Sequence, residues 1–448
     1  MLYSIAKDGA NIDVDPAFRI NSQGDAEVRT LQKRLTKCYA QHVVDLWSQQ
    51  RGLLFRIADI GIANEMVHKS PAHWFPKPVD QLDAQGNDVN VNGRFLLDLS
   101  NISNPEIQVN GGTAKELAGA RYGKFHLVSA TDVFIGIMIH VVTQQLLWKD
   151  IFMWKLDIKG AFSRFNFNKD SALLLGVIVA AGILFIFTHG MFGWTGCPNV
   201  FNVIASAILR LIRRECKGVI FLYVDDFMGF GTLLQCAHDQ ALSVDRCKEA
   251  LGTDAIANNK TVLPTRKAVI LGWETTIHDD GVWIRPSTKG INKILFVFFC
   301  FDDTKGQPYS LWVVLAAIAE RYSNGILGAR CLVAGLNKMV GASLRRPRSK
   351  TTATSEARFE IEMWRVMGLL LWSNPTSLSI SIEMFTHRYD ITKSQANRSV
   401  YTITDASGWR ICVALYDAET KVLIAWSSYL FPFQLIPELY QNNREFWE

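Results

Sequence analysis

The sequence has few of the features that mark secreted, fibrous or disordered proteins. Its eight cysteines are scattered, and no two of them form a Cys-x-x-Cys pair. We therefore expect reduced thiols in an intracellular protein, with neither a disulfide framework nor a zinc site. Charged residues make up only 20% and hydrophobic residues 49%, with 13 prolines. This composition excludes intrinsic disorder, collagen-like repeats and a coiled coil.

We also expect no secretion signal, and the sequence shows neither an internal repeat nor a strong excess of one charge. Residues 1–15 carry charge and contain no apolar core of the signal-peptide type. The net charge of +5 suits a polyanionic partner but is too small to identify one. At 448 residues the chain is about two to three times as long as a common domain, so we expect several structural units.

One uncharged run raises the question of a membrane span. Ser171–Thr188 contains 18 residues without a charge, which is near the lower limit for a spanning helix. The alternative is a buried β-hairpin with arms at Leu173–Val179 and Ile183–Phe187. We favour the hairpin because the arms have the length of strands, glycine lies between them, and no Lys/Arg asymmetry flanks the run. We therefore expect a soluble protein, in the cytoplasm or the nucleus, without a membrane partner.

The most informative segment is Val219–Gly229, in which two apolar arms meet at a turn that carries Asp225 and Asp226. Aspartate is a favoured turn residue, and the pairs at 279–280 and 302–303 have the pattern of solvated turns. By itself, the pair at 225–226 is therefore compatible with a plain turn.

A third carboxylate changes this interpretation. Phe152–Asp157 is a short apolar strand that ends in an aspartate. Three aspartates at the ends of neighbouring strands can hold two divalent cations for an in-line phosphoryl transfer. Their hard oxygen ligands select Mg²⁺ or Mn²⁺.

Together these motifs resemble the reverse transcriptases of retroviruses and retrotransposons. Tyr223–Asp226 is similar to their Tyr-x-Asp-Asp box, and Asp157–Phe162 to the preceding strand with an aromatic residue five positions after the aspartate. Phe192–Phe201, between them, is similar to the Gly/Pro turn that binds the nucleotide. Arg94–Ser100 resembles a strand of the fingers, and residues 259–260 and 271–273 resemble the last palm strand and the primer-gripping hairpin.

The resemblance implies a two-metal catalytic site. Asp157 and Asp225 are the main ligands of two Mg²⁺ or Mn²⁺ ions, the backbone carbonyl of Ile158 adds a ligand, and Asp226 supports them. A primer on an RNA or DNA template and deoxynucleoside triphosphates are the implied partners.

The resemblance also assigns nucleotide-binding and primer-binding residues. Arg94 holds the triphosphate by charge-assisted hydrogen bonds, and Phe162 excludes the ribose 2′-hydroxyl. Phe192 and Gly193 contact the nucleotide, because glycine permits close backbone approach. Lys260 protonates or orients pyrophosphate. The residues that grip the primer are Leu271, Gly272 and Trp273.

Two departures bear on the subfamily and on the nucleotide contacts. Many relatives have Gln where Phe192 stands, so this chain offers stacking in place of a hydrogen bond. No lysine lies shortly before Arg94, where retroviral enzymes have a second cation. Together with the Phe192–Trp194 variant, Arg94–Ser100 followed by Val109 and Asn110 is more similar to retrotransposons of the tyrosine-recombinase type than to retroviral enzymes.

The C-terminal segment resembles the start of a ribonuclease H domain. Tyr401–Trp409 is similar to its first strand, with Asp405 as the first carboxylate, and Glu445 is the second. The resemblance implies four carboxylates, so we expect this incomplete ribonuclease H-like module to be inactive.

We therefore predict an α+β protein of the right-hand polymerase class that acts as an RNA- and DNA-directed DNA polymerase. One alternative is a catalytically silent, nucleic-acid-binding remnant of a mobile element. Another, which Phe162 and the C-terminal segment disfavour, is a viral polymerase that copies RNA into RNA. The predicted parts are an N-terminal helical lead-in (1–90), fingers (91–150), palm (151–166), a fingers hairpin (167–191), palm (192–285), thumb and connection (286–395) and the incomplete ribonuclease H-like domain (396–448).

Overall fold

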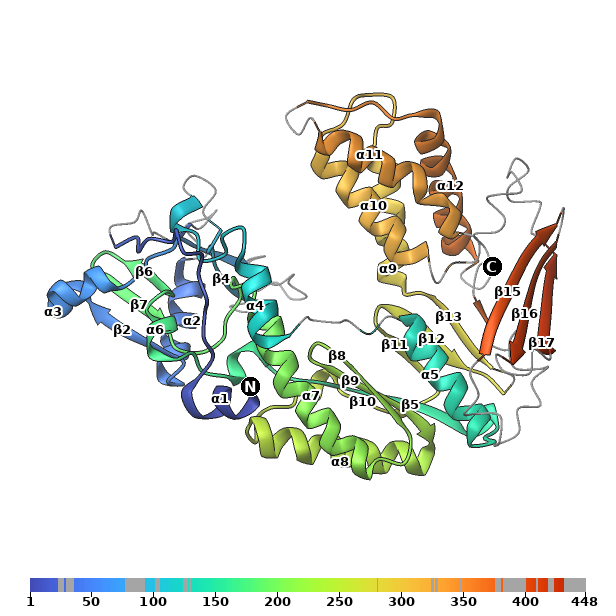
Figure 1. Cartoon of the computed structure of the whole chain (residues 1–448), viewed down its shortest axis with the longest axis horizontal. Coiled ribbons are helices and arrows are strands. Elements are labelled where there is room, and N and C mark those ends of the chain that lie inside the picture. The colour runs from blue at the N-terminus through green and yellow to red at the C-terminus, as the bar shows by residue number, and fades with distance from the viewer. Residues whose placement is uncertain are drawn as a thin grey trace, which may run out of the picture.

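The structure is a computed structural model of the whole chain. It describes residues 1–22, 28–29, 36–76, 93–100, 105–123, 128, 130–279, 281–323, 326, 329–345, 349–374, 380–381, 400–407, 410–417 and 423–430. In Figure 1 the N-terminal elements lie at the left, a sheet backed by two long helices lies at the bottom, and a group of helices lies at the upper right.

The N-terminal group contains two small sheets and several helices. In one sheet β7 (Ile183–Phe187) lies between β2 (Gly52–Arg56) and β6 (Gly176–Ala180). In the other, β3 lies between β1 and β4. The remaining elements of this group are β1 (Val28–Arg29), β3 (Ala72–Pro76), β4 (Gly93–Leu97), α1 (Leu2–Asp8), α2 (Thr36–Ser48), α3 (Ile57–Ile60), α4 (Ala114–Tyr122) and α6 (Lys169–Ala172).

The hairpin predicted in the uncharged run is confirmed. β6 and β7 pair antiparallel around Gly182, which has a φ of +70°. The first arm starts at Gly176 because the preceding residues form α6 and its C-terminal turn. Among the helices that the structure describes, none combines the length and hydropathy that a membrane-spanning segment requires.

The segment 1–90, predicted to be helical, contains strands as well as helices. β2 adds to β7 along its whole length, with Gly52 opposite Phe187. A Cβ at Gly52 would lie 2.1 Å from the Phe185 ring, so glycine permits this close packing. The pairing partner is about 130 positions away along the chain, and local periodicity carries no information about it.

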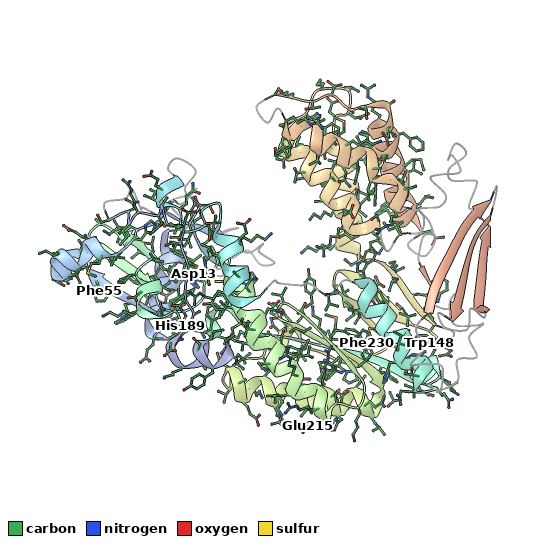
Figure 2. All side chains as sticks on the ribbon, in the orientation of Figure 1. Asp13, Phe55, Trp148, His189, Glu215 and Phe230 are labelled. Atoms are coloured by element: carbon green, nitrogen blue, oxygen red, sulfur yellow. The ribbon has the colours of Figure 1, made fainter. Side chains whose placement is uncertain are left out.

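The central sheet is antiparallel, with the strand order β10-β5-β9-β8. Side chains alternate along its strands. Trp154 of β5 belongs to a core that includes residues of the two long helices α7 and α8, whereas Met153, on the opposite face, belongs to a core that includes residues of α5. Trp148 and Phe230 belong to this second core (Figure 2). The bounds are β5 (Ile151–Asp157), β8 (Val219–Tyr223), β9 (Asp226–Thr232), β10 (Val262–Thr265), α5 (Ala130–Thr143), α7 (Cys197–Glu215) and α8 (Leu233–Leu251).

Local signals explain where the two backing helices begin. Thr232 and Gln235 form a reciprocal capping box at the start of α8, which satisfies two backbone N–H groups of the first turn. α7 has a proline in its first turn, where the missing N–H costs nothing.

The remaining chain forms a second sheet, a group of helices and a third sheet. β11 (Lys267–Ile270), β12 (Trp273–Ile277), β13 (Val282–Pro286) and β14 (Ile380–Ser381) are neighbours in this order. The helices share a core in which Phe298 and Trp364 stack with centroids 5.4 Å apart. Their bounds are α9 (Thr288–Cys300), α10 (Tyr309–Ser323), α11 (Ala334–Leu344) and α12 (Ser355–Ser373). β15 (Val400–Ser407), β16 (Arg410–Asp417) and β17 (Leu423–Leu430) form an antiparallel sheet.

Candidate active site

Strand pairing brings the three predicted aspartates to one end of the central sheet. β5 and β9 pair antiparallel with Asp157 directly opposite Asp226. β8 and β9 form the hairpin whose turn contains Asp225, and Tyr223 lies opposite Asp226. Residues that pair across two antiparallel strands have side chains on the same face, with Cβ atoms about 5 Å apart.

The backbone around the aspartates is held by hydrogen bonds and contains a strained residue. Ile158 N–H donates to the carbonyl of Asp225 (3.0 Å), and Ala257 N–H donates to the carbonyl of Asp157 (3.0 Å). Val224 has a φ of +56°, a conformation that is unfavourable for a β-branched residue. Such strain persists only where the surrounding structure enforces it, so the turn geometry is fixed by its neighbours.

Two lysines contact the carboxylates. Lys260, in a 3₁₀ turn at Asn258–Lys260, donates from Nζ to both carboxylate oxygens of Asp157 at 2.9 Å. Lys155 of β5 donates to Oδ2 of Asp226 at 2.8 Å. Asp226 Oδ1 is buried and has no hydrogen-bond partner among the described residues. Lys155 was not among the predicted site residues, although period-two alternation places it on the same face of β5 as Asp157.

Burial and mutual repulsion make this cluster unfavourable for three negative charges. Burial raises the pKa of Asp225, and the charges of Asp226 and Asp157 raise it further. Burial also raises the pKa of Asp226, against the opposing effect of the Lys155 ammonium. Nearby positive charge therefore stabilises the ionised cluster.

The donor chemistry of the cluster fits Mg²⁺ or Mn²⁺, since all its side-chain donors are carboxylate oxygens. The unpartnered Oδ1 of Asp226 is consistent with a further cation. In the described part of the chain, no group of three or more His, Cys, Asp or Glu side chains already has the arrangement of a metal site. Asp157 is only 7% exposed, and both of its carboxylate oxygens accept hydrogen bonds from Lys260. The Lys260 side chain is 61% exposed, so its ammonium can move into solvent, but the buried Asp157 carboxylate then needs another cation in its place.

The Lys155–Asp226 pair leads to a stability prediction. We expect Lys155→Met to lower the free energy of unfolding by about 2 kcal/mol, because it leaves a mostly buried carboxylate without its cation. The midpoint of urea unfolding measures this loss. Lys159→Met is the matched control on an exposed lysine, and its effect should stay within about 0.5 kcal/mol. Equal midpoints for the two variants would show that the Lys155–Asp226 pair does not stabilise the fold.

Two of the predicted nucleotide-binding residues, Phe162 and Phe192, form a second cluster. The rings of Phe162 and Phe192 meet edge to face with centroids 5.5 Å apart, and Phe201 contacts Phe162 from α7. Phe192 is 41% exposed. Gly193 has a φ of +132°, and a Cβ at this position would lie 2.1 Å from the Leu97 carbonyl oxygen. Only glycine fits this close approach of two backbones.

The remaining predicted site residues differ in how far the structure describes them. Arg94 lies in β4 with its backbone opposite Phe75, and its side chain lies outside the described residues. Asp405 lies in β15 opposite Cys412; its side chain is likewise outside the described set, as is the whole of Glu445.

The predicted primer-gripping residues form the turn between β11 and β12. Leu271 and Gly272 both have positive φ, +51° and +85°, as in the tight turns that suit twisted hairpins. Trp273 is buried and packs edge to face on Tyr322 of α10. The turn is therefore held against the helical group.

No protein-family model matches this sequence, and no curated protein matches it. Solved structures do match. One is described as the foamy viral protease-reverse transcriptase dRH in complex with double-stranded DNA; it has a TM-score of 0.52 and 15% identity, and the match covers 98% of this chain and 61% of that one.

Two further structures agree. The foamy viral protease-reverse transcriptase in complex with double-stranded DNA has a TM-score of 0.53, 14% identity and coverage of 98% and 73%. The foamy viral protease-reverse transcriptase in complex with an RNA/DNA hybrid has a TM-score of 0.50 and 16% identity, and the match covers 94% of this chain and 47% of that one. This chain thus spans 61% of the first of these proteins. At these identities the likeness concerns the fold alone, and it leads to one conclusion: the chain has a mixed helix-and-sheet, reverse-transcriptase-like fold.

Proposed function

We propose that the chain is an RNA- and DNA-directed DNA polymerase that adds deoxynucleotides to a primer 3′-hydroxyl. The observation that carries this proposal is the meeting of Asp157, Asp225 and Asp226 at one end of the central sheet in a reverse-transcriptase-like fold. The proposed palm comprises residues 151–166 and 192–285, with fingers at 91–150 and 167–191 and thumb and connection at 286–395.

In this proposal the three aspartates hold two Mg²⁺ or Mn²⁺ ions. Asp157 and Asp225 are the main ligands, with the Ile158 carbonyl and Asp226 in support. The ions would supply Lewis-acid stabilisation of charge on the reacting phosphate. Lys260 holds Asp157 before ions bind, and its exposed side chain then becomes available to pyrophosphate. Lys155 keeps Asp226 ionised and in place.

Phe162 is proposed as the residue that excludes a ribose 2′-hydroxyl. We expect Phe162→Ala to reduce discrimination against ribonucleotides by about tenfold or more, because steric exclusion is lost while the reacting groups stay in place. The ratio of kcat/KM for deoxyribo- and ribonucleotides measures this change. Phe162→Tyr keeps the bulk and should keep the ratio. If Phe162→Ala rejects ribonucleotides as strongly as the parent, another residue is the gate.

A catalytically silent, nucleic-acid-binding protein is the second candidate. Three clustered acids repel one another, so a protein that binds no metal would need another source of positive charge to keep them together. Lys155 and Lys260 supply two positive charges within hydrogen-bond distance, which meets part of that need. Phe192, where many relatives have Gln, also favours this candidate.

Primer extension separates the two candidates. The purified chain is incubated with a poly-rA template, an oligo-dT primer, dTTP and either Mg²⁺ or Mn²⁺. The proposed polymerase extends the primer, and omission of the metal abolishes extension. Binding of the primer–template without extension under either metal would favour the silent protein. The proposed inactivity of residues 396–448 toward the RNA strand of a hybrid stays a prediction.

A further inference from the structure

The turn at Phe192–Thr195, which leads into α7, is held by residues far from it in the sequence. Leu97 N–H donates to the carbonyl of Phe192 at 3.0 Å. The indole of Trp194 is buried against Tyr122 of α4 and Phe167. These contacts fix one side of the turn, next to β4.

The side-chain amide of Asn110 holds the other side of the turn. Its Nδ2 donates to the Gly193 carbonyl at 2.6 Å, and its Oδ1 accepts from Thr195 N–H at 3.0 Å. Nδ2 also contacts Ser100 Oγ at 3.2 Å. A backbone carbonyl can only accept and a backbone N–H can only donate, so these partners fix the orientation of the amide. Of the side chains of this size, only an asparagine can satisfy both.

Asn110 is itself held in place. Its backbone N–H donates to the carbonyl of Leu99 at 2.9 Å, just beyond β4. Asn110 therefore links the end of β4 to the turn: its backbone binds Leu99, and its side-chain amide binds Gly193 and Thr195, which directly follow Phe192 and Trp194.

The consequence for Phe192 is geometric. Its ring is partly exposed and meets Phe162 edge to face, and its backbone is continuous with Gly193, whose φ of +132° is open to glycine only. A glycine in a turn has many accessible conformations. The two hydrogen bonds with Asn110 hold the Gly193 carbonyl and the Thr195 N–H in one of them, directly after Phe192 in the chain.

We propose that Asn110 is a positioning residue of the nucleotide site. By fixing Gly193 and Thr195, it presents the Phe162–Phe192 pair as a preformed apolar wall for the sugar and base of the incoming deoxynucleotide. This inference rests on the proposed polymerase function. It assigns to Asn110 an effect on nucleotide binding and not on chemistry or on primer–template binding.

The test compares Asn110→Ala and Asn110→Asp with the parent chain. Asn110→Asp keeps the size and the acceptor but sets a carboxylate oxygen against the Gly193 carbonyl, so it also serves if the alanine variant folds poorly. We expect KM for the nucleotide to rise about tenfold in both, with kcat changed less than about threefold, since ordering of the turn is then provided by the nucleotide itself. Ser100→Ala removes only the outer contact and should leave KM within about twofold.

A second measurement needs no activity. Amide hydrogen exchange over residues 192–196 should become faster in both Asn110 variants and stay unchanged in Ser100→Ala. The inference is overturned if KM and exchange match the parent, or if kcat falls while KM is unchanged. If the parent chain extends no primer, the proposed function fails and the inference fails with it, whereas an active parent with unaffected Asn110 variants refutes the inference alone.

Discussion

Replacing Asp225 by asparagine is expected to reduce primer extension by about a thousandfold or more. The substitution preserves size and hydrogen-bonding capacity but removes one negative charge from a site whose proposed task is to hold two divalent cations. The backbone of Asp225 accepts from Ile158 N–H, and this bond is unaffected by the change. Single-turnover extension rates at saturating nucleotide measure the loss.

The control for Asp225→Asn is the same change at Asp279, which pairs with Arg266 on the surface. Loss of that exposed pair is worth at most about 1 kcal/mol of stability, and extension should stay at the parental rate. Direct titration with Mn²⁺ measures metal affinity independently of catalysis. Asp225→Asn should weaken Mn²⁺ binding, and Asp279→Asn should leave it unchanged. Parental extension by Asp225→Asn would overturn the metal assignment.

Gly193→Ala is expected to reduce kcat/KM for the nucleotide by about a hundredfold or more. An added Cβ would lie 2.1 Å from the Leu97 carbonyl oxygen, and backbone on both sides of this contact prevents a small local adjustment. Either the turn or the end of β4 must move, and Phe192 moves with the turn. A displacement of about 1 Å at a substrate-positioning residue is enough for such a loss.

The chain offers a matched control for this substitution. Gly182 also has a positive φ, +70°, but no atom of the described residues lies within 4 Å of a Cβ added there. Gly182→Ala should therefore cost about 1 kcal/mol of stability from its backbone conformation and leave kcat/KM unchanged. If the two variants have the same kcat/KM, the close approach of Gly193 to Leu97 does not control nucleotide binding.

The candidate site was predicted only in part. The three aspartates could be found because Asp157 ends a short apolar strand and the pair at 225–226 lies where two apolar strands meet, and strand ends are visible in the hydrophobic pattern. Lys155 carries a weaker signal, which is its alternation with Asp157 on one strand. Lys260 was expected to face pyrophosphate, but its contact with Asp157 spans 103 positions, and no local pattern indicates such a contact.

Asn110 shows the same limit. Beside Val109 it was noted as a subfamily feature, with no role at the turn. Its two hydrogen bonds with the turn reach residues 83 and 85 positions away. Their existence depends on how β4 lies against Phe192, which is a matter of tertiary packing.

The sequence by itself determined the turn with its paired aspartates, the hairpin in the uncharged run and the order of the motifs, because these depend on hydrophobic periodicity and on glycine within a few residues. Only the tertiary structure decided which strands are neighbours, that β2 joins the hairpin arm β7, and which cations meet the carboxylates. Pairing of distant strands and burial of charge depend on the whole core, since a strand satisfies its backbone groups equally well with many partners and the hydrophobic packing of both faces selects one.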